Sequence, residues 1–333
     1  MKRLEIIEFL KGYSIFTIIV FHYLQYLHFQ GFFGQVIFFG GTGVHLFILI
    51  SGLGLYLSYQ RKRLPYIEFL KKRFGKIYIP YILIIAVVAF ISLIIPLYRN
   101  SLYAFGGHVL LYKMFDESII GSYGYPMWFM SMIFQFYILF YMITAVKKRM
   151  KAYPFILVTL AISLGWALVV DLLGYADKRI WNSFFLSYLW EFAIGMHIAS
   201  LIFSGNKIKG SGLKPFWFLI IGLGFSGIYG FMAIKGGDSG KMFNDIPALI
   251  GYSSLAIWIY LAGIKFINRA MIFFGQIAFP VYLLHTFLLD LSIAIFKTQY
   301  MMLNLGIAFG LTILLSIYYQ KFIVRFYRTV RIA

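Results

Sequence analysis

The sequence predicts an all-α, polytopic transmembrane helical bundle of about ten spanning helices, with both termini in the cytoplasm. The first observation behind this fold class is the composition, because 62% of the 333 residues are hydrophobic and only 12% are charged. A soluble domain carries about 25% charged residues. The second observation is that apolar runs of about twenty residues recur along the whole chain, and each is long enough to cross a bilayer as a helix.

The apolar runs divide the chain into ten expected spans. The first run is long and lacks a small-residue cleavage site, so we expect it to remain as a spanning helix and not to be removed as a signal peptide. The spans are expected at residues 5–27, 35–59, 76–97, 127–146, 153–173, 183–204, 214–234, 246–267, 271–296 and 301–325. The longest connection is 98–126, and its stretch HVLLYKMF is expected to form a short interfacial helix. We therefore expect residues 1–333 to form a single integral-membrane domain with no appended soluble domain.

The basic residues alternate between the two sides of this expected topology. One set of connections, taken with both termini and Lys11, holds 23 of the 30 Lys and Arg residues, and the other set holds seven. Cytoplasmic loops of membrane proteins are enriched in Lys and Arg, so the basic set and both termini are placed in the cytoplasm of a multi-pass cytoplasmic-membrane protein. The net charge of +19 then reflects topology and contact with anionic lipid, and we expect no nucleic-acid partner.

The first span carries a cation and an imidazole on one helical face. Lys11 and His22 are eleven positions apart, which is about three full turns, so they lie about 16 Å apart along the same face. Glu8 lies one turn before Lys11 and can pair with it. Ionisable groups are expensive to bury in a membrane, which makes both residues functional candidates. The alternatives are that Lys11 extends to the interface and that His22 makes a hydrogen bond between helices.

Further polar residues are expected at a similar depth in other spans. These residues are His45, Glu191, His285 and Asp290. Together with His22 they would line a polar cavity if their helical faces converge, although each residue taken alone is more often a packing or hydrogen-bonding residue. Gly41 and Gly43 allow a tight entry or a close backbone approach. Ser51, Gly52 and Gly54 can loosen the helix or let a neighbour pack closely.

A basic pair precedes the third span. Arg73 and Lys76 are three positions apart, so they share a helical face. One interpretation is a positively charged anchor on the cytoplasmic side. The other is a phosphate-binding pair, because Arg binds phosphate through a bidentate fork and Lys binds it as a point charge. The chain has no cysteine, which excludes thiol nucleophiles and thiolate metal sites, and we predict no metal site.

Five patterns follow one another in a specific order along these spans. They are Lys11 and His22 in LKGYSIFTIIVFH; Gly43, Val44, Phe47, Ser51 and Gly52 in GTGVHLFILISG; Arg73 and Lys76 before Pro80; Trp128, Phe129, Phe136 and Tyr137 in PMWFMSMIFQFYIL; and Tyr282 and His285 in VYLLH. In this order they resemble the acyltransferase-3 family of integral-membrane acyltransferases, nearly from end to end.

This resemblance implies an activity and roles for several residues. Members of the family move an acyl group, usually acetyl, from cytoplasmic acyl-coenzyme A to a hydroxyl of an extracytoplasmic glycan or a related acceptor. His22 would be catalytic, as a general base or a transient acyl carrier, and Lys11, Arg73 and Lys76 would bind the coenzyme. Acetyl-coenzyme A would be a donor substrate, so no permanently bound cofactor is expected. The resemblance leaves the acceptor and the oligomeric state open.

The chain also departs from the family pattern. Lys11 stands where Arg is commoner, and Arg73 with Lys76 replaces a pair of arginines. Ile133 and Phe134 occupy positions where many members carry a glutamate, and Glu191 or Asp290 are candidates to replace that carboxylate. Two other functions remain as alternatives: a transporter or flippase for a glycan, lipid or small molecule, and a non-catalytic assembly partner.

Overall fold

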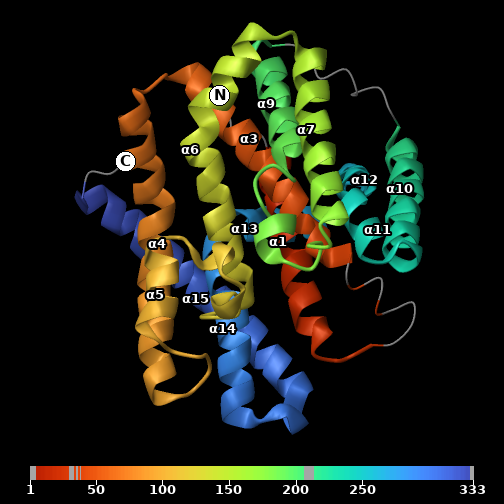
Figure 1. Cartoon of the computed structure of the whole chain (residues 1–333). Coiled ribbons are helices and arrows are strands. Elements are labelled where there is room, and N and C mark those ends of the chain that lie inside the picture. The colour runs from red at the N-terminus through yellow and green to blue at the C-terminus, as the bar shows by residue number, and fades with distance from the viewer. Residues whose placement is uncertain (1–4, 30–33, 35–36, 38, 206–213, 331–333) are drawn as a thin grey trace. The chain divides into compact units, whose positions relative to one another are not determined.

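The chain folds into helices joined by turns (Figure 1). The computed structural model describes residues 5–29, 34, 37, 39–205 and 214–330, and these residues include no β-strand. The all-α prediction is therefore confirmed. The basic loop at residues 206–213 and part of the start of the expected second span lie outside the described residues.

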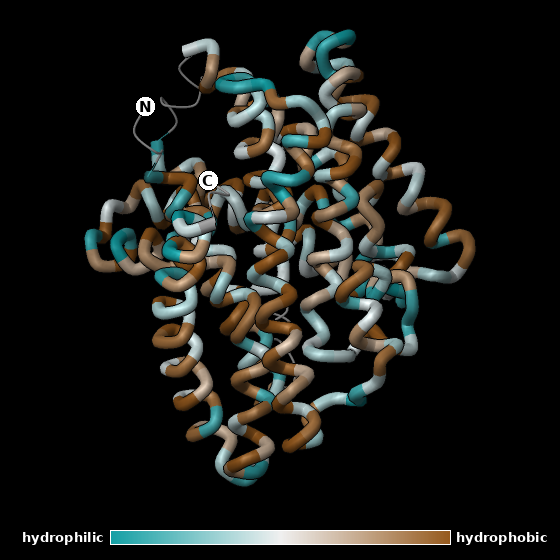
Figure 2. Tube along the Cα trace, turned by 90° about the vertical axis from the view of Figure 1, so that its left-hand side faces the viewer, coloured by the Kyte–Doolittle hydropathy of each residue, from teal (hydrophilic) through white to brown (hydrophobic). Residues whose placement is uncertain are grey.

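In the part of the chain that the structure describes, eight helices are long and apolar enough to cross a membrane. They are Glu5–Gln25, Gly40–Arg61, Tyr66–Ile94, Tyr125–Arg149, Ala152–Leu172, Pro215–Lys235, Ala278–Phe296 and Thr298–Thr329. Two shorter apolar helices, α9 (Leu189–Phe203) and α12 (Asp245–Leu261), stand where the sixth and eighth spans were expected. Hydrophobic residues extend along the long helices in Figure 2. The polytopic helical bundle is thus confirmed, while the number of spans and the side of the termini stay predictions.

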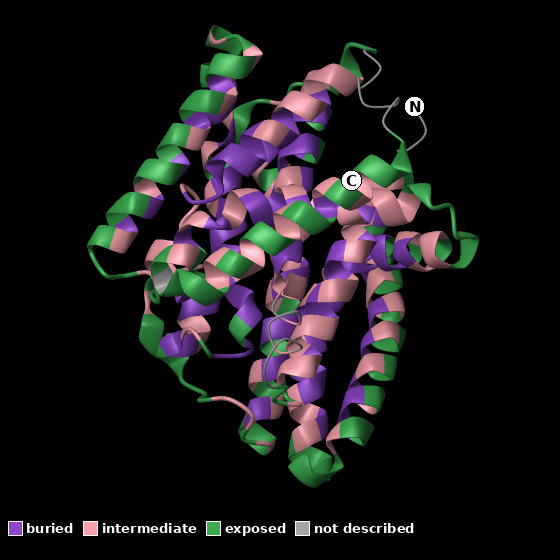
Figure 3. Ribbon diagram, turned by 90° about the vertical axis from the view of Figure 1, so that its right-hand side faces the viewer, coloured by how far each residue is buried: buried purple, intermediate pink, exposed green. Residues whose placement is uncertain are grey.

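The chain divides into two compact units, each of which combines two separate stretches of sequence. Unit 1 comprises Met1–Arg63 and Phe140–Gln276, and unit 2 comprises Leu64–Leu139 and Ile277–Ala333. Within the helices, buried residues form stripes beside exposed ones (Figure 3). One-sided burial of this kind is expected where a helix packs on a neighbour and presents its other side to lipid.

Besides α9 and α12, unit 1 contains α1 (Glu5–Gln25), η1 (Gly40–Thr42), α3 (Gly43–Arg61), α7 (Ala152–Leu172), α8 (Arg179–Asn182), α10 (Pro215–Lys235), α11 (Gly237–Phe243), α13 (Lys265–Gln276) and the end of α6 (Trp128–Arg149). In unit 1, α1 packs against α3, α12 and α13, while α9 packs on α3 and α10 packs on α12. One core cluster is made of five buried residues on α3, α9 and α12, namely Leu46, Ile50, Trp190, Leu249 and Tyr252.

Glycines bring the backbones of unit 1 into direct contact, as the sequence predicted. A Cβ at Gly41 would meet the Phe21 ring, and a Cβ at Gly43 would meet Ile18 at 3.0 Å, so the start of α3 lies against α1. A Cβ at Gly52 would overlap the Phe192 carbonyl of α9. Gly43 and Gly52 therefore lie where two helices meet at backbone distance, whereas Gly41 faces a side chain. The close packing predicted as one possibility at Gly54 is not found, since a Cβ there would meet nothing within 4 Å.

Unit 2 is built from the remaining helices and a folded connection. It contains α4 (Tyr66–Ile94), α5 (Leu102–Val109), η2 (Lys113–Phe115), η3 (Glu117–Ile119), η4 (Tyr125–Met127), the first half of α6, α14 (Ala278–Phe296), η5 (Thr298–Tyr300) and α15 (Met301–Val330). Tyrosine hydroxyls of α15 donate to carbonyls of α4, from Tyr319 to Pro80 at 2.7 Å and from Tyr327 to Gly75 at 2.8 Å. These bonds satisfy backbone oxygens near the proline of α4.

Two helix predictions differ from the structure. The expected span at 271–296 is two helices, because α13 ends at Gln276 and α14 begins at Ala278. Pro280 explains the break, since its ring would clash with the carbonyl four residues earlier if one helix continued. The expected helix in HVLLYKMF is also wrong: α5 ends at Val109, and Leu111 has a φ of 62°, which turns the chain.

The connection between α4 and α6 is held by buried polar groups. Lys113 is fully buried and donates from Nζ to the carbonyls of Ser122 and Gly124, each at 2.6 Å. His108 is also fully buried, with Nδ1 2.7 Å from the Tyr81 hydroxyl and Nε2 3.1 Å from the Ser122 carbonyl. Burial, and then the charge of Lys113, holds the pKa of His108 well below its usual value. The neutral ring therefore accepts from Tyr81 at Nδ1 and donates to Ser122 at Nε2.

Candidate functional site

The face of α1 that carries Lys11 and His22 is continuous in the structure. Both residues lie in one unbroken helix, so their separation of about 16 Å along the axis holds. Lys11 Nζ lies 3.2 Å from Glu8 Oε1, which is the pairing that the sequence predicted. His22 Nδ1 lies 3.3 Å from the amide oxygen of Gln25. Lys11 and His22 are each partly buried, whereas Glu8 is buried.

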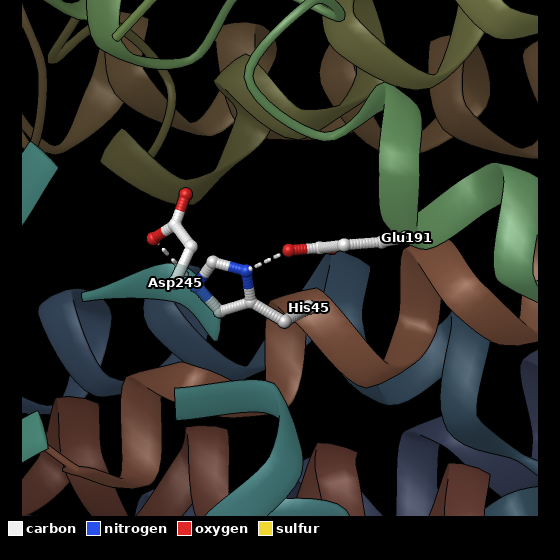
Figure 4. A group of neighbouring side chains, drawn as sticks. All are labelled: His45, Glu191 and Asp245. Atoms are coloured by element: carbon white, nitrogen blue, oxygen red, sulfur yellow. Dashed lines mark hydrogen bonds and ion pairs between the residues drawn. The ribbon is translucent and has the colours of Figure 1, made fainter. Parts of the chain in front are cut away.

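A second titratable group of unit 1 forms where α3, α9 and α12 meet. Figure 4 shows His45 between Glu191 and Asp245, with a different ring nitrogen facing each carboxylate. His45 Nδ1 lies 2.6 Å from Glu191 Oε1, and His45 Nε2 lies 3.6 Å from Asp245 Oδ1. The first distance is that of a strong charge-assisted hydrogen bond, whereas the second is too long for a hydrogen bond. We call these three residues the His45 cluster.

The two sides of the His45 cluster differ in their access to the surroundings. The Glu191 side chain is fully buried, while the side chains of His45 and Asp245 keep 14% and 25% of their exposure. The cluster is therefore closed on the Nδ1 side of the ring and partly open on the Nε2 side. Among the described residues, Glu191 Oε2 has no hydrogen-bond partner.

Local structure explains why two acidic residues can be held here. Glu191 lies in the first turn of α9, and Asp245 is the first residue of α12. The N-terminus of a helix carries partial positive charge and unsatisfied N–H groups, which stabilise a nearby carboxylate. The two helix N-termini thus offset part of the cost of burying these acids. The ring of Tyr188 packs edge-on against His45, with 5.6 Å between the ring centroids.

The donor set of the cluster could in principle hold a metal ion. His45, Glu191 and Asp245 each offer one ligand atom, and these atoms lie within 4.8 Å of one another. However, one ion can bind only one nitrogen of an imidazole, and the two carboxylates here face opposite nitrogens. The ring would have to rotate before a single ion could reach all three residues. The geometry present is that of a carboxylate-oriented histidine.

The two other site candidates on α3 lie next to the packing contact with α9. Gly52 is buried against the Phe192 backbone, and Ser51 is half-buried beside it. In α9 a Cβ at Gly195 would in turn overlap the backbone of Leu49. This reciprocal contact fixes the spacing between α3, which carries His45, and α9, which carries Glu191.

The basic pair of unit 2 lies within a helix instead of before one. Because α4 begins at Tyr66, Arg73 and Lys76 are in its third turn and share a face. Both side chains are half-buried, and the Arg73 guanidinium lies 5.6 Å from the centre of the Phe69 ring. Among the described residues, the buried Arg73 Nε has no hydrogen-bond partner.

The remaining candidates of unit 2 have contacts within that unit. Trp128 is buried at the start of α6 against Phe129. His285 is fully buried and its Nδ1 lies 2.8 Å from the carbonyl of Tyr282. Asp290 accepts a hydrogen bond from the Tyr98 hydroxyl.

The expected layer of five polar residues is therefore found only in part within unit 1. His45 and Glu191 are brought together, and His22 lies on a neighbouring helix of the same unit, whereas His285 and Asp290 belong to unit 2. The sequence interpretation missed Asp245. It had placed this residue at the end of a connection, and its one signal was an acid directly before an apolar run, in NDIPALIG.

Taken together, the apolar helices and the buried ionisable groups define an integral-membrane protein with a polar site among its helices. A family model described as an acyltransferase domain matches residues 4–321. Because this match covers nearly the whole chain, the protein belongs to the acyltransferase-3 family and is a membrane acyltransferase. No match was found among the curated proteins or among the solved structures.

Proposed function

We propose that the protein is an O-acyltransferase that uses acyl-coenzyme A, usually acetyl-coenzyme A, and acylates a hydroxyl of an extracytoplasmic glycan or a related acceptor. The observation that carries this proposal is the face of α1, on which Lys11 and His22 lie about 16 Å apart in one unbroken helix. Within an acyltransferase, such a face suits a long donor whose charged end and reactive thioester are well separated.

In this mechanism His22 acts at the reactive end of the donor. As a general base, His22 takes the hydroxyl proton while the acceptor oxygen attacks the thioester carbonyl, the carbon–sulfur bond breaks, and the coenzyme leaves as a thiolate. As an acyl carrier, His22 attacks the thioester first and releases the same thiolate. The acceptor oxygen then attacks the acyl carbon on His22, the carbon–nitrogen bond breaks, and the hydroxyl proton passes to the departing imidazole. The half-buried position of His22 favours both roles, because a low-dielectric site strengthens the interactions that stabilise developing charge.

Three basic residues are proposed to bind the charged part of the donor. Lys11 lies on the same face as His22, toward the N-terminus of α1, and the charge distribution predicts that this end is cytoplasmic. In unit 2, Arg73 and Lys76 share a face of α4, and the buried Arg73 Nε has no partner among the described residues. A guanidinium and an ammonium are suited to phosphate groups such as those of coenzyme A.

A binding experiment tests this proposal before any acceptor is known. Purified protein in detergent is titrated with radiolabelled coenzyme A, and the variants Lys11→Ala and Arg73→Ala are compared with wild type. Lys151→Ala is the matched control, because Lys151 is an exposed lysine of a connection on the same expected side. A hydrogen bond to a charged group contributes about 1.5–3 kcal/mol, so each site variant should weaken binding by about 10–100-fold.

The opposite result would favour transport, the alternative function that the sequence left open. If wild-type protein does not bind coenzyme A, and proteoliposomes containing it move a glycan, a lipid or a small solute, then the chain acts as a transporter that retains the family fold. Equal binding by Lys11→Ala, Arg73→Ala and Lys151→Ala would exclude these residues from the coenzyme site.

A further inference from the structure

Three cations of unit 1 gather around two stacked tyrosine rings at the end of α3. Arg63 Cζ lies 5.9 Å from the centre of the Tyr59 ring, and Lys148 Nζ lies 4.8 Å from the same centre. Lys147 Nζ lies 5.0 Å from the centre of the Tyr56 ring, which stacks on the Tyr59 ring at 6.0 Å. Among the described residues, no carboxylate forms an ion pair with these three cations. Contact with the rings offsets part of the repulsion between the like charges, and a bound anion would offset more of it.

The Tyr59 hydroxyl adds a donor beside these cations. Lys148 Nζ donates to this hydroxyl at 2.8 Å, so the oxygen acts as an acceptor toward the ammonium. A phenolic hydroxyl can donate as well as accept, and an ammonium has three N–H groups. Within the described part of the chain, the Tyr59 proton has no acceptor. The hydroxyl proton of Tyr59 and further N–H groups of Lys148 are therefore available to one ligand.

Arg63 completes a donor set that suits a phosphate group. Its guanidinium lies beside the Tyr59 ring and makes no hydrogen bond to a described residue. A guanidinium binds phosphate through a bidentate fork, and an ammonium binds it as a point charge. A phosphate monoester offers three acceptor oxygens, so it can accept from Arg63, Lys148 and Tyr59 together.

These donors are accessible on the side of the membrane where phosphates are expected. Arg63 and Lys148 are exposed and Tyr59 is half-buried, so a ligand can reach them without an internal cavity. Arg63 follows the end of α3, and Lys148 lies in the last turn of α6. The distribution of basic residues predicts that both helix ends are cytoplasmic. Acyl-coenzyme A and the headgroups of anionic phospholipids both present phosphates on that side.

From these observations we infer that Tyr59, Arg63 and Lys148 form a phosphate-binding site, which we call the Tyr59 site. None of these residues is among the three proposed above for the donor. The phosphate belongs either to coenzyme A or to an anionic phospholipid. The coenzyme source rests on the proposed function and would give the donor a further contact in unit 1, whereas the lipid source does not depend on that function.

The alternative is that these side chains serve only packing and topology. The bond from Lys148 to Tyr59 also joins α6 to α3, and cations at cytoplasmic helix ends are common in membrane proteins. In that case the hydroxyl of Tyr59 contributes to stability and binds no ligand. Tyr59→Phe keeps the ring and the cations and removes the hydroxyl, so it distinguishes a binding role from a packing role.

The test measures two anionic probes on the same set of variants. Purified protein in a neutral detergent is titrated with radiolabelled coenzyme A in one arm and with radiolabelled dihexanoyl-phosphatidylglycerol in the other. Dihexanoyl-phosphatidylcholine is the control ligand, because choline neutralises the charge of its phosphate. The variants are Tyr59→Phe, Arg63→Gln, Lys148→Gln and the double variant of the two cations. Lys151→Gln is the matched control, since Lys151 is an exposed lysine three positions beyond Lys148. The melting temperature reports whether each variant is folded.

We expect wild type to bind at least one anionic probe saturably and to bind phosphatidylcholine much more weakly. For that probe, Arg63→Gln and Lys148→Gln should each weaken binding about fivefold, which is the effect of one cation at an anionic surface. The double variant should weaken binding by more than about tenfold. Tyr59→Phe should weaken it by about 2–10-fold, the effect of one hydrogen bond, and Lys151→Gln should match wild type. The probe that loses affinity identifies the source of the phosphate.

Several results would overturn the inference. Wild type may bind neither anionic probe, or the double variant may bind both as tightly as wild type. The inference also fails if Lys151→Gln weakens binding as much as the cluster variants, because the effect would then be one of general charge. A Tyr59→Phe variant that changes only the melting temperature would indicate a packing role.

Failure of the Tyr59 site and failure of the proposed function can be distinguished. If Lys11→Ala weakens coenzyme binding while the double variant binds both probes normally, the site is wrong and the proposed function stands. If wild type does not bind coenzyme A, the proposed function fails, and the phosphatidylglycerol arm alone decides whether the Tyr59 site exists.

Discussion

The contact between α3 and α9 allows a quantitative prediction about the spacing of His45 and Glu191. Replacing Gly52 with alanine would place a Cβ 3.0 Å from the Phe192 carbonyl carbon and 3.1 Å from its Cα, with the carbonyl oxygen closer still. Carbon atoms rest at about 3.5–4.0 Å, so the two helices would have to separate by about 0.5–1 Å. Overpacking of this kind costs about 1–3 kcal/mol.

The same displacement should disturb the His45 cluster. The hydrogen bond between His45 and Glu191 joins the two helices at 2.6 Å. A separation of about 1 Å would lengthen it to about 3.6 Å, which is no longer a hydrogen bond. We therefore expect Gly52→Ala to lower the melting temperature and to break the hydrogen bond between His45 and Glu191.

Gly54→Ala is the matched control in the same helix. A Cβ at Gly54 would meet nothing within 4 Å, and the residue is exposed. The assay is thermal unfolding in detergent. If Gly52→Ala melts like Gly54→Ala, the close packing of α3 on α9 does not determine the geometry of the cluster, and the reasoning is wrong.

Three further predictions concern the polar groups of unit 2. Lys113→Met removes the Nζ hydrogen bonds to the carbonyls of Ser122 and Gly124, which keep only the longer bonds from His108 Nε2 and Met127 N, and should destabilise the protein by about 1–3 kcal/mol in total, measured by thermal unfolding. Because the pKa of His108 is depressed in the folded state, the unfolded chain binds its proton first as the pH falls below about 6.5. Stability should thus decrease from pH 7 to pH 5, and the decrease in melting temperature should be smaller in His108→Gln. Tyr98→Phe removes the donor to Asp290 and should cost about 1 kcal/mol of stability, yet leave kcat per folded molecule within about twofold of wild type.

The sequence predicted the helical bundle well, because apolar length is a local property. The ten expected spans correspond to eight long helices and the shorter α9 and α12, apart from the break at Pro280. The break was missed since the apolar run continues through residues 271–296, and hydropathy alone does not register the clash that proline imposes. The close approaches at Gly43 and Gly52 were predicted because small residues let helices pack closely, but the same reasoning does not hold at Gly54, which faces open space.

The candidate site was only partly predictable, because it depends on which helical faces meet. Lys11 and His22 share one helix, so their spacing in the sequence directly predicted that they lie on one helical face. His45 and Glu191 are 146 positions apart, and nothing in their local sequence indicated a hydrogen bond between them. Asp245 was missed for the same reason, since an acid at the start of a helix is usual and its neighbour comes from a distant segment.

The central claim is that His22 takes part in the acyl-transfer reaction of this membrane protein. The most direct measurement supplies radiolabelled acetyl-coenzyme A to inverted membrane vesicles that contain wild type, His22→Ala or His28→Ala. His28 is an exposed histidine just beyond α1 and serves as the matched control. We predict that label reaches protein or acceptor in wild type and His28→Ala but not in His22→Ala. Equal transfer by wild type and a folded His22→Ala variant would contradict the account.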